Sequence, residues 1–324
     1  MTDEKPVAYD VTRLSKIKPP DVAQPAWLVE GLWSRNAVGC IGGAPKSYKT
    51  WLALELALAV ASGKPCLGRY AVAARGPVLL FCAEDGPDEI RVRVAGLAKA
   101  RGIDFDSLAI GWITTSSLLL DDPVHRRRLT ATVVAMKPRM LILDPLVRLH
   151  RGDENSAADV SDLLAFLRGL QRDHGVAIVL VHHVRKSAAS EPGQGLRGSG
   201  DLHAWGDSNL YVVRRDGKPL LVAEHRARRA PPPIAIRLEG DPPRLVVDDV
   251  PAEVPVDPLE QRIVAALTER PITRTALRER LQVRNETLGA AIDRLVASDR
   301  VRRVDDGLVV PVPTSGDQRE RNGP

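Results

Sequence analysis

The sequence G-A-P-K-S-Y-K-T, residues 43–50, lies between a short apolar run at 37–41 and a helical apolar run at 51–61. A strand, a short loop and a helix in this order are typical of a phosphate-binding loop, where backbone N–H groups at a helix N-terminus bind an anion. We expect Lys49 to contact the β- and γ-phosphates and the Thr50 hydroxyl to bind Mg²⁺. The stretch predicts a site for ATP and Mg²⁺, built from Gly43, Ala44, Pro45, Lys46, Ser47, Tyr48, Lys49 and Thr50.

One residue of this loop departs from the pattern G-x-x-x-x-G-K-[ST]. Tyr48 stands where the second glycine belongs. If the backbone has a positive φ there, a tyrosine costs about 1 kcal/mol or more. We therefore expect the tyrosine to be tolerated rather than required. The alternative for the whole stretch is a lysine-containing helix cap without a ligand, and the strand–loop–helix context favours the nucleotide site.

Apolar runs and helical patterns alternate through residue 182, which predicts an α/β domain with a mostly parallel sheet. The expected strands are 37–41, 78–83, 108–113, 140–144 and 177–182, and the expected helices are 50–62, 88–101, 124–136 and 157–174. After residue 200 the period changes. Short strands at 209–214, 220–225, 234–238 and 245–248 are expected to extend the sheet in antiparallel fashion.

The C-terminal part has a different pattern. Residues 249–258 contain three prolines and no helical period, which indicates a linker. Three helical segments and a hairpin with a turn at Asp306-Gly307 follow, as in a winged helix-turn-helix domain. The expected organisation is an N-terminal extension (1–24), an ATPase domain (25–248), the linker (249–258), a winged-helix domain (259–312) and a disordered tail (313–324).

Composition narrows the class of protein. The formal net charge is +5, and residues 184–229 contain nine basic and five acidic side chains, which fits either a solvated basic face or a nucleic-acid contact. In residues 257–310 ten arginines face nine acids, so DNA binding and protein contacts remain equal alternatives for the winged helix. The chain has three widely spaced cysteines and no signal-peptide pattern, and no apolar stretch is long enough to span a membrane. We therefore expect a cytoplasmic protein without a membrane partner.

Three predicted strands end in side chains that suit phosphate chemistry. Asp144 ends the apolar run M-L-I-L-D, where a carboxylate beside the phosphate loop can bind Mg²⁺ and its water shell. Glu84 ends the strand 78–83 and can orient and deprotonate a water, although Asp85 follows directly. The strand at 177–182 leads into His182-His183, which is either a buried histidine pair or a sensor of the γ-phosphate.

The loop that follows, residues 184–201, is rich in glycine and contains the basic residues Arg185, Lys186 and Arg197 but no aromatic residue. Cations without a stacking platform favour contacts with phosphates over contacts with bases. We therefore expect these three residues to bind single-stranded DNA through its backbone, independently of its sequence.

In this order, the motifs G-A-P-K-S-Y-K-T, L-L-F-C-A-E-D, M-L-I-L-D-P-L, V-L-V-H-H, L-R-G-S-G-D and V-A-E-H-R resemble the RecA-like P-loop ATPases of the plasmid RepA type, the AAA_25 family. That family is similar to the DnaB-like hexameric helicases, and the resemblance covers about residues 25–245. It implies Lys49 and Thr50 on phosphate and Mg²⁺, Glu84 as catalytic base, Asp144 as the Walker B acid, His183 as sensor, and Arg226 as an arginine finger that enters the neighbouring subunit's site. Tyr48 departs from the pattern, and so does Glu224, where the DnaB pattern often has lysine.

Three functions are consistent with these residues. The first is an ATP-hydrolysing, ring-forming homohexameric motor, similar to the replicative helicases of plasmids, phages and mobile elements. The second is an ATP-switched regulatory protein that binds DNA without unwinding it. The third is a recombinase-like filament of the RecA or KaiC kind. All three rest on fold-level analogy, so they are expectations that experiments must separate.

Overall fold

The computed structural model describes residues 10–17, 26–152, 157–183, 200–215, 217–248, 258–267, 271–297, 301–304 and 307–309. The chain divides into two compact units, Met1–Ala252 and Glu253–Pro324, each of which is considered by itself. The expected tail and nearly all of the expected linker lie outside the described residues, as does most of the expected N-terminal extension.

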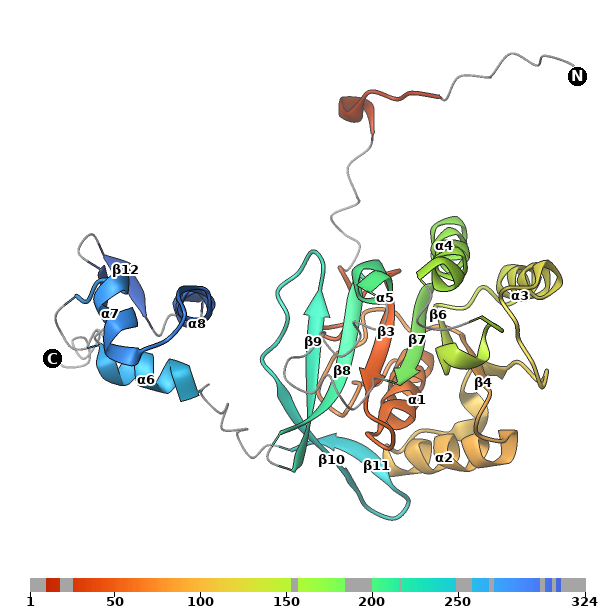
Figure 1. The fold of residues 1–324 in the computed structure, drawn as a ribbon. Coiled ribbons are helices and arrows are strands. Elements are labelled where there is room, and N and C mark those ends of the chain that lie inside the picture. Colours follow the sequence, from red (N-terminus) through yellow and green to blue (C-terminus); the bar gives the residue numbers. More distant parts are fainter. Residues whose placement is uncertain are drawn as a thin grey trace, which may run out of the picture. The chain divides into compact units, whose positions relative to one another are not determined.

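The first unit is built around a nine-stranded sheet with the order β11-β10-β9-β8-β3-β7-β6-β4-β5 (Figure 1). The strands are β3 (Val38–Gly43), β4 (Val78–Cys82), β5 (Ile110–Trp112), β6 (Met140–Asp144), β7 (Ala177–His183), β8 (Ser208–Arg215), β9 (Lys218–His225), β10 (Ile234–Glu239) and β11 (Arg244–Val247). All neighbours from β8 to β5 pair in parallel, and β9, β10 and β11 continue the sheet in antiparallel fashion. A mostly parallel sheet with an antiparallel extension is thus confirmed.

One strand pairs differently from the expectation. β8 was expected to open the antiparallel extension, but it lies parallel to β3, with Gly43 opposite Val212. The chain leaves β7 at the carboxyl edge of the sheet and enters β8 after α5 (Gly200–Trp205), at the amino edge. A crossover between those edges gives a parallel pair, and only the next turn reverses the chain.

Helices cover both faces of this sheet (Figure 1). α1 (Lys49–Ser62) and α2 (Pro87–Ala100) pack on one face. α3 (Pro123–Met136), α4 (Ala157–His174) and α5 pack on the other. Because both faces are covered, β3, β4, β6 and β7 are apolar over most of their length, which is why they are visible in the sequence as apolar runs.

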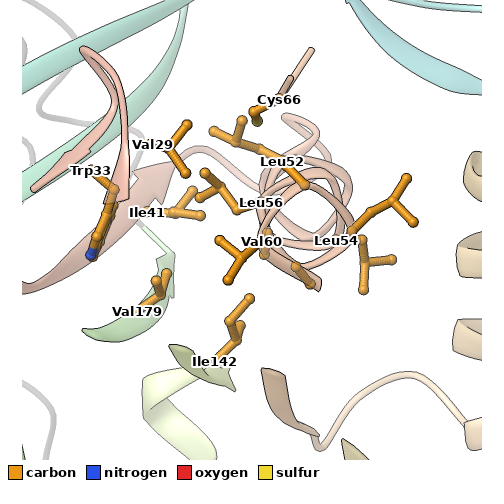
Figure 2. Packing of buried hydrophobic residues seen from close by; sticks show 14 of the residues in the cluster. Val29, Trp33, Ile41, Leu52, Leu54, Leu56, Val60, Cys66, Ile142 and Val179 are labelled. Carbon is orange, nitrogen blue, oxygen red and sulfur yellow. The ribbon is translucent and has the colours of Figure 1, made fainter. Parts of the chain in front are cut away.

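The helix that follows the phosphate loop is buried on nearly all sides. Leu56 and Val60 of α1 lie toward Ile41 of β3 and Ile142 of β6 in the core (Figure 2). Burial of each large aliphatic side chain contributes about 1.5–3 kcal/mol. The helix ends at Gly63, whose left-handed backbone (φ 78°) lets its N–H donate to the Ala59 carbonyl. The start of α1, and with it the loop, therefore has a firmly held position.

A buried ion pair ties α1 to its neighbours. The Glu55 carboxylate of α1 accepts hydrogen bonds of 2.9 Å from Arg101, which follows α2. The same guanidinium donates to the Leu245 carbonyl of β11 over 3.0 Å. Burial raises the pKa of Glu55, and the Arg101 contact opposes that shift. The pair links the antiparallel edge of the sheet to the helix that presents the phosphate loop.

The second unit contains three helices followed by a two-stranded hairpin: α6 (Pro258–Ala266), α7 (Arg274–Leu281), α8 (Asn285–Ala297), β12 (Arg302–Val304) and β13 (Gly307–Val309). It has a core of its own around Ile263, Leu277, Leu288 and Leu295. This order of elements is the one expected of a winged helix, and the assignment as such a domain stays a prediction. Several of its arginines donate to carbonyls within the unit: Arg262 to Leu281, Arg274 to Asn285 and Arg280 to Ala266.

None of the helices in the described parts of the chain has both the length and the apolar composition that a membrane span requires.

Candidate nucleotide-binding site

The predicted phosphate loop connects the end of β3 to the start of α1. Its first residue, Gly43, lies where side chains do not fit: a Cβ there would be 2.6 Å from Ser47 Oγ and 2.7 Å from the Val212 carbonyl oxygen. Lys46 and Tyr48 both have positive φ angles, 61° and 67°. The loop therefore turns tightly at the carboxyl edge of the sheet and places its backbone N–H groups before the N-terminus of α1.

Tyr48 has the left-handed backbone that the missing glycine would adopt freely, with φ 67° and ψ 17°. The positive φ that would strain a tyrosine is therefore present, and this backbone conformation costs a non-glycine residue about 1 kcal/mol or more. The side chain is partly buried and packs against the apolar cluster around α1. This packing offsets part of the backbone cost and explains how a tyrosine is accommodated.

Replacement of Tyr48 by glycine is expected to leave ATP affinity equal to the wild type, or tighter by at most about fivefold, because about 1 kcal/mol of strain is released. The melting temperature should fall, because the ring's packing is lost. Titration with a fluorescent ATP analogue and thermal unfolding measure the two effects, and Tyr48→Phe, which keeps the ring, is the control. A large loss of affinity in Tyr48→Gly would contradict this and place the ring on the nucleotide or on a neighbouring copy.

The lysine, threonine and aspartate predicted for phosphate and Mg²⁺ lie together. Lys49 is buried, and its Nζ donates to the Ala44 carbonyl of the loop over 2.7 Å. The Thr50 hydroxyl donates to Asp144 Oδ2 at the end of β6 over 2.8 Å. Burial lowers the pKa of Lys49 to about 8 against the attraction of Asp144 and Glu84. Burial likewise raises the pKa of Asp144 to about 6, against the Thr50 hydrogen bond.

These residues fit a triphosphate with Mg²⁺. Ser47 Oγ is buried and, among the described residues, has no hydrogen-bond partner, which costs about 1–3 kcal/mol for a donor left unsatisfied. The Lys49 ammonium contacts only a loop carbonyl among the hydrogen bonds of the described residues. Thr50 and Asp144 offer the hard oxygen ligands that Mg²⁺ prefers. Lys49 and the loop N–H groups would bind the phosphates, and Thr50 and Asp144 would hold the metal that neutralises their charge.

Mg²⁺-dependent nucleotide affinity should be highest between about pH 6 and about pH 8. Below that range Asp144 is protonated and loses the metal, and above it Lys49 is neutral and loses the phosphates. Without ligand, the raised pKa of Asp144 means that stability falls as pH rises from about 4 to about 6. Calorimetry with a non-hydrolysable ATP analogue from acid to alkaline pH measures the profile. In Asp144→Asn the loss at low pH should disappear, and a flat wild-type profile would contradict the assignment.

The structure distinguishes the two acids that follow β4. Asp85 Oδ2 lies 2.8 Å from Arg93 Nη1 of α2, so Asp85 is engaged by the helix. Glu84 Oε2 lies 3.5 Å from His183 Nε2 at the end of β7. Arg148, which sequence reasoning missed, brings its Nε to 3.9 Å from Glu84 Oε1. The only sequence signal for Arg148 was that it follows Asp144, the last residue of β6, by four residues.

The two histidines at the end of β7 have different surroundings. His182 is buried, and burial, together with the charges of His183 and Lys49, lowers its pKa to about 4. A neutral ring in the core corresponds to the first of the two alternatives for this pair. His183 is half-buried and faces Glu84. Of the two, only His183 therefore contacts the group expected to act on water.

Arg226 lies away from the phosphate loop of its own chain. It follows β9, whose last residue, His225, pairs with Ser208 at the amino edge of the parallel strands, whereas the loop leaves the carboxyl edge. The nearby Glu224 lies 3.7 Å from His203 Nδ1, and burial raises its pKa. Arg226 is not brought to the site formed by Lys49 and Asp144. Arg185, Lys186 and Arg197, expected to bind DNA, lie outside the described residues.

Comparison with known proteins agrees with this geometry. The family model AAA_25, described as an AAA domain, matches residues 4–189, more than half of the chain. A DnaB-like replicative helicase, solved in a study of its interactions with primase, superimposes with a TM-score of 0.51 at 15% identity, covering 65% of this chain and 57% of that one. RadB recombinase is similar with a TM-score of 0.44 at 18% identity, covering 63% and 88%. The helicase likeness shows a shared RecA-like fold, and the chain belongs to the AAA_25 family of P-loop ATPases.

Proposed function

We propose that this protein hydrolyses ATP as a DNA-stimulated, ring-forming motor similar to replicative helicases. The observation that carries the proposal is the cluster at the carboxyl edge of the sheet, where the Thr50–Asp144 pair and the Glu84–His183 pair lie beside one phosphate loop. One pair supplies oxygen ligands for Mg²⁺, and the other supplies a carboxylate in contact with a strand end that can respond to the γ-phosphate.

Each residue has a separate task in hydrolysis. Lys49 and the loop N–H groups would bind the triphosphate, and Thr50 and Asp144 would hold the Mg²⁺ that neutralises its charge. Glu84 accepts a proton from the water that attacks the γ-phosphorus. His183 lies between this carboxylate and the segment that begins at residue 184, so a shift at the γ-phosphate is transmitted along the chain over few residues.

The position of Arg226 supports assembly into a ring. An arginine at the edge opposite its own phosphate loop can complete the site of a second copy when the copies associate head to tail. Such a guanidinium neutralises charge that develops in the transition state and thus belongs to the active site of the neighbour. Hydrolysis therefore depends on assembly.

DNA binding is assigned to Arg185, Lys186 and Arg197. Replacement of all three by alanine should weaken single-strand binding about equally for all sequences and lower the salt slope of log K by roughly 0.7 per lost phosphate contact. DNA-stimulated ATPase activity should drop while basal activity persists. Fluorescence anisotropy over a salt series measures the slope. Arg127→Ala/Arg128→Ala on the exposed side of α3 is a control for charge. An unchanged slope would instead place DNA binding on the C-terminal unit.

A regulatory protein that binds DNA without unwinding it is the second candidate. The separate core of the C-terminal unit, with its three helices and hairpin, favours this candidate because a winged helix can recognise a site by itself. Strand separation on a forked duplex in the presence of ATP decides between the two. Both candidate functions are consistent with the predicted domain organisation. Both are also consistent with a cytoplasmic location, which the free, buried Cys40, Cys66 and Cys82 support.

A further inference from the structure

Asp207 lies between α5 and β8 in the chain and contacts both β3 and α4. Its backbone N–H donates to the Val38 carbonyl over 2.7 Å, and its Oδ2 accepts from the Val38 N–H over 3.3 Å. Val38 is the first residue of β3, the strand that leads to the phosphate loop. The carboxylate is therefore fixed to the centre of the sheet, although it is itself only half-buried.

Arg168 of α4 neutralises this carboxylate. Its Nη1 lies 2.5 Å from Asp207 Oδ2, and its Nη2 lies 3.3 Å from Oδ1. The guanidinium also donates to the Trp205 carbonyl at the end of α5, and its carbon lies 5.6 Å from the centre of the Trp205 ring. A two-point contact of this kind orients the carboxylate in addition to pairing its charge.

Arg226 contacts the same residue in a different way. Its backbone N–H donates to the Asp207 carbonyl over 3.0 Å, so the start of the side chain is held in place. The guanidinium donates to the Ala204 carbonyl, and its Nη1 lies 3.6 Å from Asp207 Oδ1. The side chain is 54% exposed. Its charged end thus has one hydrogen bond and one longer ion pair and is about half exposed to solvent, while its backbone is held by Asp207.

The two arginines are therefore not equivalent. If the Arg226 guanidinium leaves, Asp207 remains paired with Arg168, so no buried charge is left alone. Loss of an exposed ion pair costs only about 0–1 kcal/mol. The guanidinium can therefore move to another anion at a small cost in free energy. The Arg226 backbone stays in place because it is bonded to Asp207, which β3 and α4 hold.

We propose that Asp207 is the positioning residue of Arg226: it presents the guanidinium at the amino edge of the sheet, ready for the triphosphate bound by a second copy of this chain. Arg168 orients the Asp207 carboxylate through its two-point contact. The proposal rests on the proposed action of Arg226 across a subunit boundary. It adds the residues that hold the arginine before the neighbouring site receives it.

Asp207→Asn tests this, since the amide keeps the shape and the acceptor for the Val38 N–H but removes the charge. We expect kcat for ATP to fall about tenfold, the effect of weakening rather than removing an electrostatic contact. ATP affinity and assembly mass should stay at wild-type values. Asp207→Glu should recover part of the rate. Asp162→Asn is the matched control, because Asp162 is another acid paired with an arginine, Arg126 at 2.5 Å, and its side chain is 73% exposed.

Mixing separates positioning from a structural role. Asp207→Asn mixed with Lys49→Ala should recover activity, since an intact site of the first meets an intact arginine of the second; damage to the variant's own site would not be rescued. Two results would overturn the proposal. One is wild-type turnover by Asp207→Asn. The other is that the mixture of Asp207→Asn with Lys49→Ala recovers no activity while the mixture of Arg226→Ala with Lys49→Ala does. If Arg226→Ala itself turns over normally, the finger assignment fails and Asp207 with it. Should Asp207→Asn not fold, Arg168→Lys, expected to lose rate and to recover on mixing, decides in the same way.

Discussion

Glu84→Gln is expected to lower kcat for ATP hydrolysis by ~10²-fold or more, with little change in ATP affinity. Glutamine keeps the shape of the side chain and can still accept a hydrogen bond, but it cannot take a proton from water. The neighbouring Thr50–Asp144 pair and the loop are untouched by the change, so binding is preserved. Single-turnover hydrolysis and equilibrium binding of ATP measure the two quantities separately.

Asp85→Asn is the matched control, since it removes a carboxylate one residue away. Asp85 is paired with Arg93 of α2, so its loss should affect stability more than the chemical step. Normal turnover by Glu84→Gln together with a large loss in Asp85→Asn would show that the roles of the two acids are exchanged. Lys49→Ala should differ from both because it weakens binding itself.

Arg226→Ala is expected to assemble and to bind ATP yet to hydrolyse it about 10³-fold more slowly, because an arginine finger stabilises the transition state rather than the ground state. Arg228→Ala is the matched control: Arg228 lies over the Trp27 ring of its own unit at 5.3 Å and should be dispensable for turnover. Equal losses in both variants would show that the segment, and not one guanidinium, is needed.

Action across a boundary is tested by mixing Arg226→Ala with Lys49→Ala. In a head-to-tail ring assembled at random from equal amounts, about a quarter of the interfaces pair an intact site with an intact arginine. Activity should return to a corresponding fraction of the wild type once subunits exchange. The absence of recovery, with mixed assemblies demonstrated by mass measurement, would contradict action in trans.

Much of the fold could be predicted from local patterns. Apolar runs with turn residues at their ends locate strands such as β4 and β6 to within a residue or so, because a strand buried on both faces must be apolar along its whole length. The candidate site was predictable for the same reason: the carboxyl ends of parallel strands meet at one edge, so Asp144, Glu84 and His183 had to lie near the loop. The direction of β8 was not predictable, since it depends on where the chain crosses the sheet.

By itself, the sequence determined the periodicity of each segment and the residue types at its ends, and thus the sheet, the phosphate loop and the side chains offered to it. Only the tertiary structure decided between residues that are adjacent in the chain: Glu84 rather than Asp85 faces His183, and His183 rather than His182 faces Glu84. It also brought Arg226 to Asp207, with the Arg226 N–H donating to the Asp207 carbonyl and the guanidinium 3.6 Å from the carboxylate. Such contacts join segments far apart in sequence, and their geometry follows from how helices pack on the sheet, which no local pattern contains.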